Sequence, residues 1–374
     1  MIPRLYDDLD EYLEKNKVLV IYGSRQVGKT TLLKNYLSHT KLKYKLDSGD
    51  NIKIQQVLSS QDFNQIFEYT SGYQLIALDE AQRIPNIGQA LKIIVDQVQN
   101  IFVIATGSSS FELSGQIGEP LTGRKRTLTL FPVAQAELIK SHNNFELKGK
   151  LPQCLIFGGY PAVVTAKTNK EKIEILEEIV NSYLLKDILE LEQIKGPKYL
   201  MDLLRLIAFQ VGSEVSLSEL GGKIGLDYKT VARYLDLLEK SFILYNLRGY
   251  SKNLRNEITK KSKYYFFDNG IRNAIISNFN DVQVRDDVGK LWENFLVSER
   301  LKTQAYNNIY SNNYFWRTWD GKEIDWIEER NGALFGFEFK YSDSTIKIPK
   351  DFLKAYPKSI VSVVNRENYL EFLA

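Results

Sequence analysis

Short apolar segments separated by amphipathic stretches dominate the first third of the chain. Continuous apolar runs of four to eight residues are typical of strands buried on both faces of a parallel sheet. The predicted strands cover residues 18–22, 42–47, 75–80 and 101–106. Residues 31–37 and 81–98, which lie between them, have the spacing of helices. The pattern predicts an α/β domain, which we place over residues 1–165.

Beyond this domain the apolar positions recur at helical spacing. A short helix, a turn near Gly225 and a longer helix capped by Asp227 form a helix-turn-helix pattern. Two strand-like runs, residues 242–247 and 263–267, follow as the strands of a wing would. We expect a helical linker and a winged-helix domain over residues 166–280.

The last part of the chain returns to mixed α/β patterning. Residues 291–299 have the pattern of a helix. Three strand-like runs follow, at residues 314–319, 323–329 and 334–340. Asn331-Gly332 between the last two runs is a strong hairpin signal. We expect a third domain, of α/β type, over residues 281–374.

The composition says little about the fold, but it restricts the chemistry that the chain can perform. With 44% hydrophobic and 25% charged residues in 374, the chain resembles an ordinary soluble globular protein. One cysteine and two histidines exclude an internal disulfide and argue against structural zinc, so any metal should be a hard cation bound by carboxylates. The chain does not open with a secretory segment and has no stretch apolar enough to span a bilayer, so we expect a cytoplasmic protein without a membrane partner.

The net charge is only +3, so local clusters of charge matter more than the total. One basic cluster precedes and enters the second strand of the predicted wing. It consists of Arg248, Lys252, Arg255, Lys260, Lys261 and Lys263. It is either a solvated hairpin or a surface that contacts phosphates.

Gly23–Thr30 has the form G-x-x-x-x-G-K-T, which is the phosphate-binding loop. The backbone N–H groups of such a loop point at the β-phosphate, Lys29 reaches the β- and γ-phosphates, and the Thr30 hydroxyl binds Mg²⁺. The strand before the loop and the helix after it provide the expected context. The predicted contacts to ATP are Gly23, Ser24, Arg25, Gln26, Val27, Gly28, Lys29, Thr30 and Thr31.

Two carboxylates end the third predicted strand. Asp79 would hold Mg²⁺ through its water shell, and Glu80 would orient and deprotonate the attacking water. The alternative is that Asp79-Glu80 only starts the next helix, whose N-terminus favours acidic residues. At the tip of the fourth strand, Thr106 or Ser108 could sense the γ-phosphate, although turn chemistry explains these residues equally well.

The basic loop that follows offers an arginine for catalysis between subunits. An arginine donated to a neighbour's γ-phosphate stabilises the charge of the transition state. Arg124 is our candidate for that residue, and Arg126 is the alternative.

The order of these motifs resembles the ATPase module of a widespread prokaryotic family within the AAA+-type P-loop ATPases. The motifs are a phosphate loop with an internal Arg-Gln, Asp79-Glu-Ala-Gln, Thr106-Gly-Ser-Ser, Gly123-Arg and Phe157-Gly-Gly-Tyr-Pro161. The opening Ile2-Pro-Arg4 is similar too, and the resemblance covers nearly the whole chain. In that family the second half is catalogued as a domain of unknown function. The resemblance implies ATP and Mg²⁺ as cofactors and assembly as a homo-oligomer, for example a hexameric ring.

The winged-helix pattern has two interpretations, DNA binding and protein–protein or interdomain contact. If it binds DNA, the early turns of its second helix would meet bases or phosphates, and the wing would hold phosphates. The candidate residues are Tyr228, Lys229, Thr230 and Arg233 on the helix and Lys252, Arg255, Lys260 and Lys261 on the wing.

The C-terminal hairpin should bring Asp325 close to Glu338 and Lys340, because alternation places the last two on one face. This arrangement resembles the PD-(D/E)XK nuclease core. The resemblance implies that Asp325 and Glu338 bind Mg²⁺, that Lys340 positions or activates water, and that Glu293 on the preceding helix completes the metal site. Such a site would cleave phosphodiesters.

Two functions follow from these patterns. The first is an ATP-driven DNA-processing enzyme that cleaves DNA with Mg²⁺, with branched DNA as a candidate substrate because resolvases, which cut Holliday junctions, share this nuclease fold. The second is an ATP-dependent switch or scaffold with a catalytically silent nuclease-like domain.

Overall fold

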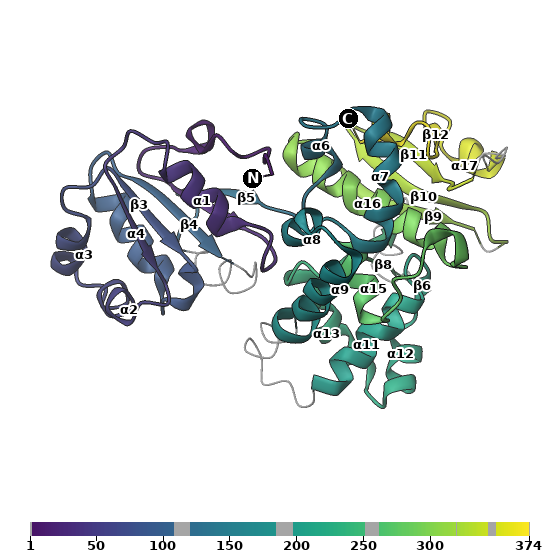
Figure 1. Cartoon of the computed structure of the whole chain (residues 1–374), viewed down its shortest axis with the longest axis horizontal. Coiled ribbons are helices and arrows are strands. Elements are labelled where there is room, and N and C mark those ends of the chain that lie inside the picture. The colour runs from purple at the N-terminus through teal and green to yellow at the C-terminus, as the bar shows by residue number, and fades with distance from the viewer. Residues whose placement is uncertain are drawn as a thin grey trace. The chain divides into compact units, whose positions relative to one another are not determined.

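The computed structural model describes residues 2–107, 120–184, 197–250, 262–318, 320–342 and 349–373. The chain divides into two compact units (Figure 1). Unit 1 is built mainly from Met1–Phe131. Unit 2 is built mainly from Pro132–Leu189, Gln193–Glu239 and Ile243–Ala374.

Unit 1 contains, within the described residues, a five-stranded sheet in the order β2-β3-β4-β1-β5. All neighbouring strands in it are parallel, so their carboxyl ends meet at one edge. The strands are β1 (Val18–Tyr22), β2 (Tyr44–Ser48), β3 (Leu75–Asp79), β4 (Phe102–Gly107) and β5 (Lys125–Thr129). The parallel α/β fold predicted for this region is confirmed.

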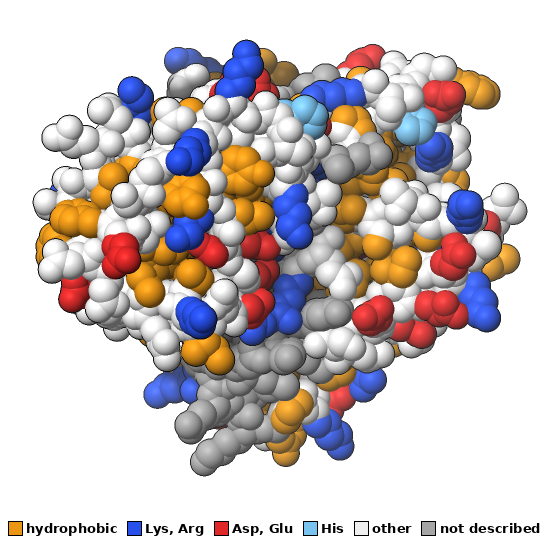
Figure 2. Space-filling model, turned by 60° about the vertical axis from the view of Figure 1, so that its left-hand side comes forward, with side chains coloured by type: hydrophobic (Ala, Val, Ile, Leu, Met, Phe, Trp, Pro, Cys, Tyr) orange, Lys and Arg blue, Asp and Glu red, His pale blue; other side chains and the backbone are white. Residues whose placement is uncertain are grey.

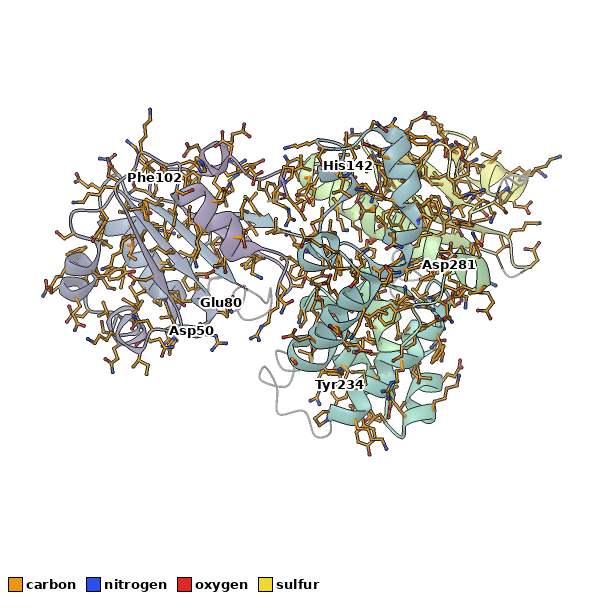
Figure 3. All side chains as sticks on the ribbon, in the orientation of Figure 1. Asp50, Glu80, Phe102, His142, Tyr234 and Asp281 are labelled. Carbon is orange, nitrogen blue, oxygen red and sulfur yellow. The ribbon has the colours of Figure 1, made fainter. Side chains whose placement is uncertain are left out.

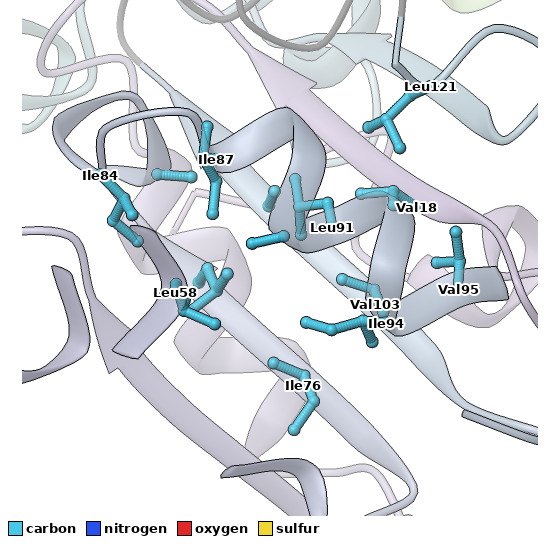
Figure 4. Packing of buried hydrophobic residues seen from close by; sticks show 14 of the residues in the cluster. Val18, Leu58, Ile76, Ile84, Ile87, Leu91, Ile94, Val95, Val103 and Leu121 are labelled. Atoms are coloured by element: carbon cyan, nitrogen blue, oxygen red, sulfur yellow. The ribbon is translucent and has the colours of Figure 1, made fainter. Parts of the chain in front are cut away.

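Helices α2, α3 and α4 cover one face of this sheet. Apolar side chains of α4, such as Leu91 and Ile94, pack against Val18, Ile76 and Val103 of the strands (Figure 4). Burial of this apolar area is the main favourable term in the folding of the unit. The helical elements of unit 1 are η1 (Leu9–Tyr12), α1 (Lys29–Leu37), α2 (Ile52–Ser59), α3 (Phe63–Thr70), η2 (Ala81–Arg83) and α4 (Ile87–Gln97).

The helix predicted over residues 81–98 is wrong in its first part. A single 3-10 turn, η2, follows Glu80, and α4 begins only at Ile87. Pro85 disfavours helical backbone at the residue before it, and Asn86 has a left-handed φ of 53°. The chain therefore turns at this point instead of continuing as one helix.

Unit 2 contains, over its described residues, a seven-stranded mixed sheet in the order β12-β11-β10-β9-β7-β8-β6. The strands are β6 (Glu214–Val215), β7 (Leu244–Gly249), β8 (Ser262–Phe266), β9 (Asn312–Arg317), β10 (Glu323–Arg330), β11 (Ala333–Phe339) and β12 (Ile360–Val364). Beside β9–β11, Trp316, Ile324 and Leu334 pack with Phe352 of α17 (Lys350–Ala355).

The helical elements of unit 2 lie mostly before β6 and between β8 and β9. They are α6 (Gln135–Leu138), α7 (Asn144–Phe157), α8 (Pro161–Thr165), α9 (Asn169–Glu178), the π-helical η3 (Ile179–Leu184), α11 (Pro197–Phe209), α12 (Leu217–Ile224), α13 (Tyr228–Lys240), α15 (Asn269–Ile275), η4 (Val282–Val284), α16 (Val288–Tyr306), α17 (Lys350–Ala355) and α18 (Tyr369–Phe372).

The structural division differs from the three domains that we expected. The main segment of the first compact unit ends at Phe131 and not near residue 165. The expected boundary near residue 280 falls inside unit 2, because β7 pairs with β9 in one sheet. The strands expected in a wing and those expected in a separate C-terminal domain therefore share a hydrogen-bonded ladder.

Charged side chains of both signs are interspersed on the face shown in Figure 2. This distribution agrees with the small net charge of +3. In the part of the chain that the structure describes, none of the helices is long and apolar enough to cross a membrane.

Candidate functional site

The phosphate loop leaves β1 at its carboxyl end and leads into α1. Its first glycine, Gly23, has a φ of 154°, and a Cβ there would lie 2.1 Å from the Leu130 carbonyl oxygen. Gly28, with a φ of 99°, caps the N-terminus of α1. Both positions therefore need glycine, one for space and one for backbone conformation. The loop places its N–H groups at a helix N-terminus, which favours anions.

Lys29 is folded back onto the loop. Its ammonium group donates hydrogen bonds of 2.8 Å to the carbonyl oxygens of Gly23 and Ser24, and its side chain is buried. The two carbonyls thus hold the ammonium within the loop that would receive phosphates.

Asp79 at the end of β3 lies against Thr30. The Thr30 hydroxyl donates a 2.8 Å hydrogen bond to Asp79 Oδ2, and the Thr106 hydroxyl donates to Oδ1. A hydroxyl and a carboxylate are hard oxygen ligands of the kind that Mg²⁺ prefers. The two groups predicted to bind Mg²⁺ are therefore side by side, and they fit that ion.

Thr106 was one of two candidates for sensing the γ-phosphate. It is fully buried, and it orients Asp79 and accepts a 3.3 Å hydrogen bond from the Glu80 N–H. The Thr106 hydroxyl therefore positions Asp79 and Glu80 at the end of β3. Ser108, the other candidate, lies outside the described residues.

Glu80 follows β3 at the carboxyl edge of the sheet, whereas Phe102, which opens β4, lies at the opposite edge (Figure 3). Glu80 has a left-handed backbone with a φ of 50° and makes no side-chain cap on η2. Gln82 Nε2 donates a 2.6 Å hydrogen bond to Glu80 Oε2. Sequence reasoning assigned no role to Gln82, although the Asp-Glu-Ala-Gln motif contains it.

Arg124 lies far from the phosphate loop of its own chain. Lys125 pairs with Val18 at the start of β1, whereas the loop follows the end of that strand. Arg124 Nε donates a 2.6 Å hydrogen bond to Asp96. Arg126 lies over the ring of Tyr12 and donates to the Glu11 carbonyl. Neither arginine can serve the nucleotide of its own chain from this edge.

Arg4 is a residue of the nucleotide site that sequence reasoning did not assign. Its guanidinium is buried and donates hydrogen bonds of 2.7 Å to the Val27 carbonyl and 2.6 Å to the Phe131 carbonyl. Arg4 therefore ties the phosphate loop to the last residue of the main segment of unit 1. The only sequence signal was its place in the Ile2-Pro-Arg4 opening.

The second group of candidates lies on the β10–β11 hairpin of unit 2. Asp325 Oδ2 accepts a 2.8 Å hydrogen bond from the Phe339 N–H, and Lys340 Nζ lies 2.9 Å from Glu338 Oε1. The register between β10 and β9 shifts between Ile324 and Ile327. Such irregularities re-aim side chains next to functional sites. The structure thus brings together Asp325, Glu338 and Lys340.

Glu293 comes from α16 and carries two partners from β8. Its Oε1 accepts a 2.6 Å hydrogen bond from the Tyr265 hydroxyl and lies 3.2 Å from Lys263 Nζ. Lys263 also forms an ion pair with Glu323. Lys263 is only 2% exposed, so neither alternative given for the basic cluster, a solvated hairpin or a phosphate-contacting surface, holds for this residue.

Burial and mutual repulsion dominate the electrostatics of these carboxylates. Burial raises the pKa of Asp325 well above its usual value, and Glu293 and Glu338 add to the rise. Burial also raises the pKa of Glu338, against the opposing effect of Lys340. These carboxylates therefore favour a nearby positive charge.

A divalent cation fits two of the three predicted ligands. Glu338 Oε2 is buried and has no hydrogen-bond partner among the described residues, and Asp325 lies beside Glu338. Across those residues, however, no group of three or more Asp, Glu, His and Cys side chains is arranged to hold a metal ion. In Glu293, the third predicted ligand, Oε1 is already engaged by Lys263 and Tyr265.

The helix-turn-helix pattern corresponds to α12, a turn and α13. Asp227 accepts hydrogen bonds from the N–H groups of Lys229 and Thr230 and from the Thr230 hydroxyl, and so caps α13 as predicted. Lys229 and Arg233 are exposed on early turns of α13. The predicted wing contacts Lys252, Arg255, Lys260 and Lys261 lie outside the described residues.

Three family models match successive parts of the chain. Residues 15–139 match the model described as an AAA domain. Residues 148–282 and 288–372 match two models described as domains of unknown function, DUF8612 and DUF4143. Unit 1 is therefore an AAA-type domain, and this match indicates ATP-dependent activity. The chain ends in a DUF4143 domain.

The similar curated proteins are uncharacterized. One from Haemophilus influenzae is 24% identical, over 92% of this chain and 86% of its own. One from Mycobacterium tuberculosis is 25% identical, over 88% and 71%, and one from Methanocaldococcus jannaschii is 23% identical, over 94% and 81%. Among solved structures, a signal transduction ATPase with numerous domains from Pyrococcus horikoshii is 13% identical with a TM-score of 0.29, over 81% of this chain and 47% of that one.

Proposed function

We propose that this chain hydrolyses ATP and uses the hydrolysis cycle to process DNA. The observation that carries the ATPase part is the contact between Thr30 and Asp79 beneath a glycine-shaped phosphate loop. Thr30 and Asp79 would hold Mg²⁺, and Lys29 would exchange its two carbonyl partners for phosphate oxygens. When bound, Mg²⁺ neutralises charge on the phosphates.

Glu80 is the proposed general base of this site. It stands at the strand tip beside Asp79, where it would orient the attacking water and accept its proton. Gln82 donates to Glu80 Oε2, and Glu80 Oε1 is the oxygen proposed to accept the proton. Arg124 is proposed to complete the site of a neighbouring copy in a homo-oligomer, with a hexameric ring as the arrangement to test first.

DNA binding is proposed for the winged-helix-like part of unit 2. The element order α11, β6, α12, α13, β7 and β8, with the strands paired as β7-β8-β6, is the order expected of a winged helix. Lys229 and Arg233 are one helical turn apart on the exposed side of α13, so both can meet phosphates. Thr230 is a weaker candidate, because its hydroxyl already donates to Asp227.

Mg²⁺-dependent cleavage of DNA is proposed for Asp325, Glu338 and Lys340. The proposal is supported by the 2.9 Å contact between Lys340 and Glu338 Oε1 on the hairpin. The other oxygen, Glu338 Oε2, is buried without a hydrogen-bond partner among the described residues, so it could bind the ion. A bound Mg²⁺ would polarise the phosphodiester and lower the pKa of water. Asp325 and Glu338 would hold that ion, and Lys340 would position the water.

An ATP-dependent switch with a silent nuclease-like domain is the second candidate. It is favoured by the engagement of Glu293 with Lys263 and Tyr265, which leaves two carboxylates for a metal where three were expected.

A cleavage assay separates the two candidates. Plasmid, linear and branched DNA are incubated with the protein and Mg²⁺, with and without ATP. Cleavage that disappears in Asp325→Ala and Glu338→Ala but persists in Glu329→Ala, a control on the same strand, supports the nuclease. No cleavage by the purified protein, or equal cleavage by all variants, favours the switch. ATP hydrolysis that survives Lys29→Ala would contradict the ATPase assignment itself.

A further inference from the structure

Lys263 is a buried lysine on β8, the strand next to the edge strand β6 of the unit 2 sheet. It lies on β8, where its backbone is paired with Glu214 of β6 and Leu247 of β7. Both neighbours fix the position of its Cα, so the ammonium can move only as far as the side chain allows. The surrounding strands leave it 2% exposed.

The ammonium group of Lys263 is surrounded by acidic and aromatic groups. It lies 3.2 Å from Glu293 Oε1, forms an ion pair with Glu323 and lies 5.3 Å from the centre of the Phe315 ring. Tyr265, on the same face of β8, donates to the same Glu293 oxygen. Arg317 reaches Glu323 from the exposed side at 3.5 Å.

Glu293 and Glu323 are half-buried, with side chains 17% and 21% exposed, and carboxylates so placed are stabilised by a positive charge beside them. In a nuclease-like site that charge is usually a divalent cation. Here a lysine from β8, outside the matched DUF4143 region, supplies it to Glu293 and Glu323. The Lys263 ammonium and the Tyr265 hydroxyl both engage Glu293 Oε1.

We propose that Lys263 is a built-in cation, which occupies a cation position between Glu293 and Glu323 and restricts any divalent ion to Asp325 and Glu338. The statement about the divalent ion at Asp325 and Glu338 rests on the proposed cleavage function, which this inference deepens. Lys263 is then a positioning residue: it acts on the site through Glu293. The site would hold one divalent ion fewer than the same carboxylates without the lysine.

The test counts bound Mn²⁺ by electron paramagnetic resonance of the free ion. The full chain is used without nucleotide and with Asp79→Asn, so that the ATPase unit does not contribute. We expect the Lys263→Met variant to bind one Mn²⁺ more than this reference protein, and Lys263→Met/Glu293→Gln to lose the additional ion. Lys290→Met, which removes an exposed lysine from α16, should bind the same number as the reference. Equal counts in Lys263→Met and the reference would overturn the proposal.

A second measurement covers a variant that folds poorly. All four tryptophans lie between residues 292 and 326, so their fluorescence reports on unit 2 alone. We expect Mn²⁺ to raise the melting temperature of Lys263→Met by more than that of the reference, and no such gain would also overturn the proposal. Failure of the cleavage function would show differently, as a reference protein that neither cuts DNA nor binds Mn²⁺ at Asp325 and Glu338. That result would leave the difference between the two Mn²⁺ counts intact.

Discussion

The Thr30 hydroxyl donates a 2.8 Å hydrogen bond to Asp79, which lies 49 residues away in the chain. This contact predicts that both side chains act on the same Mg²⁺. We expect Thr30→Ala and Asp79→Asn each to lower kcat for ATP hydrolysis at least about 100-fold, because each removes electrostatic stabilisation of the reacting phosphate. Steady-state phosphate release measures the effect. Thr30→Ser keeps the hydroxyl and should stay within about threefold of wild type.

Substitutions of Glu80 and Gln82 should slow ATP hydrolysis, and Glu80→Gln should leave ATP binding unchanged. Loss of a general base costs about 10²–10⁴ in rate, so Glu80→Gln should bind a fluorescent ATP analogue normally and hydrolyse ATP at least about 100-fold more slowly. Gln82→Ala removes only the 2.6 Å hydrogen bond that orients Glu80, and a smaller loss of about tenfold is expected. A Glu80→Gln protein with wild-type turnover would exclude Glu80 as the base.

Arg4 should support the conformation of the phosphate loop, and so nucleotide affinity, without taking part in ATP hydrolysis. Its two hydrogen bonds to carbonyl oxygens are charge-assisted, and such bonds contribute about 1.5–3 kcal/mol each. Arg4→Met should therefore weaken nucleotide binding about tenfold or more, with a smaller change in kcat. Arg4→Lys keeps the charge but not the forked geometry and should recover only part of the affinity. Isothermal titration with ATP compares the three proteins.

Arg124 predicts a test by mixing. If it serves a neighbour's nucleotide, Arg124→Ala and Lys29→Ala should each be inactive alone. Subunits of the two variants, mixed, should regain part of the ATPase activity, because some interfaces then combine an intact loop with an intact arginine. Arg126→Ala in place of Arg124→Ala serves as the comparison. Full ATPase activity of the Arg124→Ala protein would show that Arg124 takes no part in ATP hydrolysis.

Asp287 predicts a pH dependence of the stability of unit 2. Burial alone would raise its pKa, but Arg285 and Arg272 lower it to about 2. A lowered carboxyl pKa stabilises the fold above the unfolded value near 4, and this contribution disappears as the pH falls from about 4 to 2. Asp287→Asn should cost about 2 kcal/mol of unfolding free energy at pH 7 and much less near pH 2.

Urea unfolding followed by tryptophan fluorescence measures this loss. Asp286→Asn, at the exposed neighbouring position, is the matched control and should change the unfolding free energy by less than about 0.5 kcal/mol. An equal cost of Asp287→Asn at pH 7 and pH 2 would show that the ion pairs do not set the stability.

The nucleotide site could be predicted from the sequence because its parts are local or repeat a fixed order. The spacing from Gly23 to Thr30 defines the loop, and an apolar run ending in Asp79 defines the metal-binding strand tip. The hairpin that joins Asp325 to Glu338 was also predictable, since Asn331-Gly332 fixes its turn.

Contacts between distant segments could not be read in this way. Lys263 appeared as one member of a basic run, and only the pairing of β7 with β9 places it among carboxylates of the last domain. Charge alone therefore favoured an exposed surface for a side chain that is buried. The role of Arg4 was hidden for the same reason, because its partner Phe131 is 127 residues away.

The continuous sheet of unit 2 also determines how this protein can be taken apart. β7 and β8 belong to the region matched over residues 148–282, and β9–β12 belong to the region matched over residues 288–372. A fragment of the second region alone would expose the edge of β9, and an exposed strand edge is a template for aggregation. The same fragment would lack Lys263, so Glu293 and Glu323 would lose their ion-pair partner. The two regions should therefore be inherited, swapped between relatives and expressed as one piece, even though their sequences match two separate families.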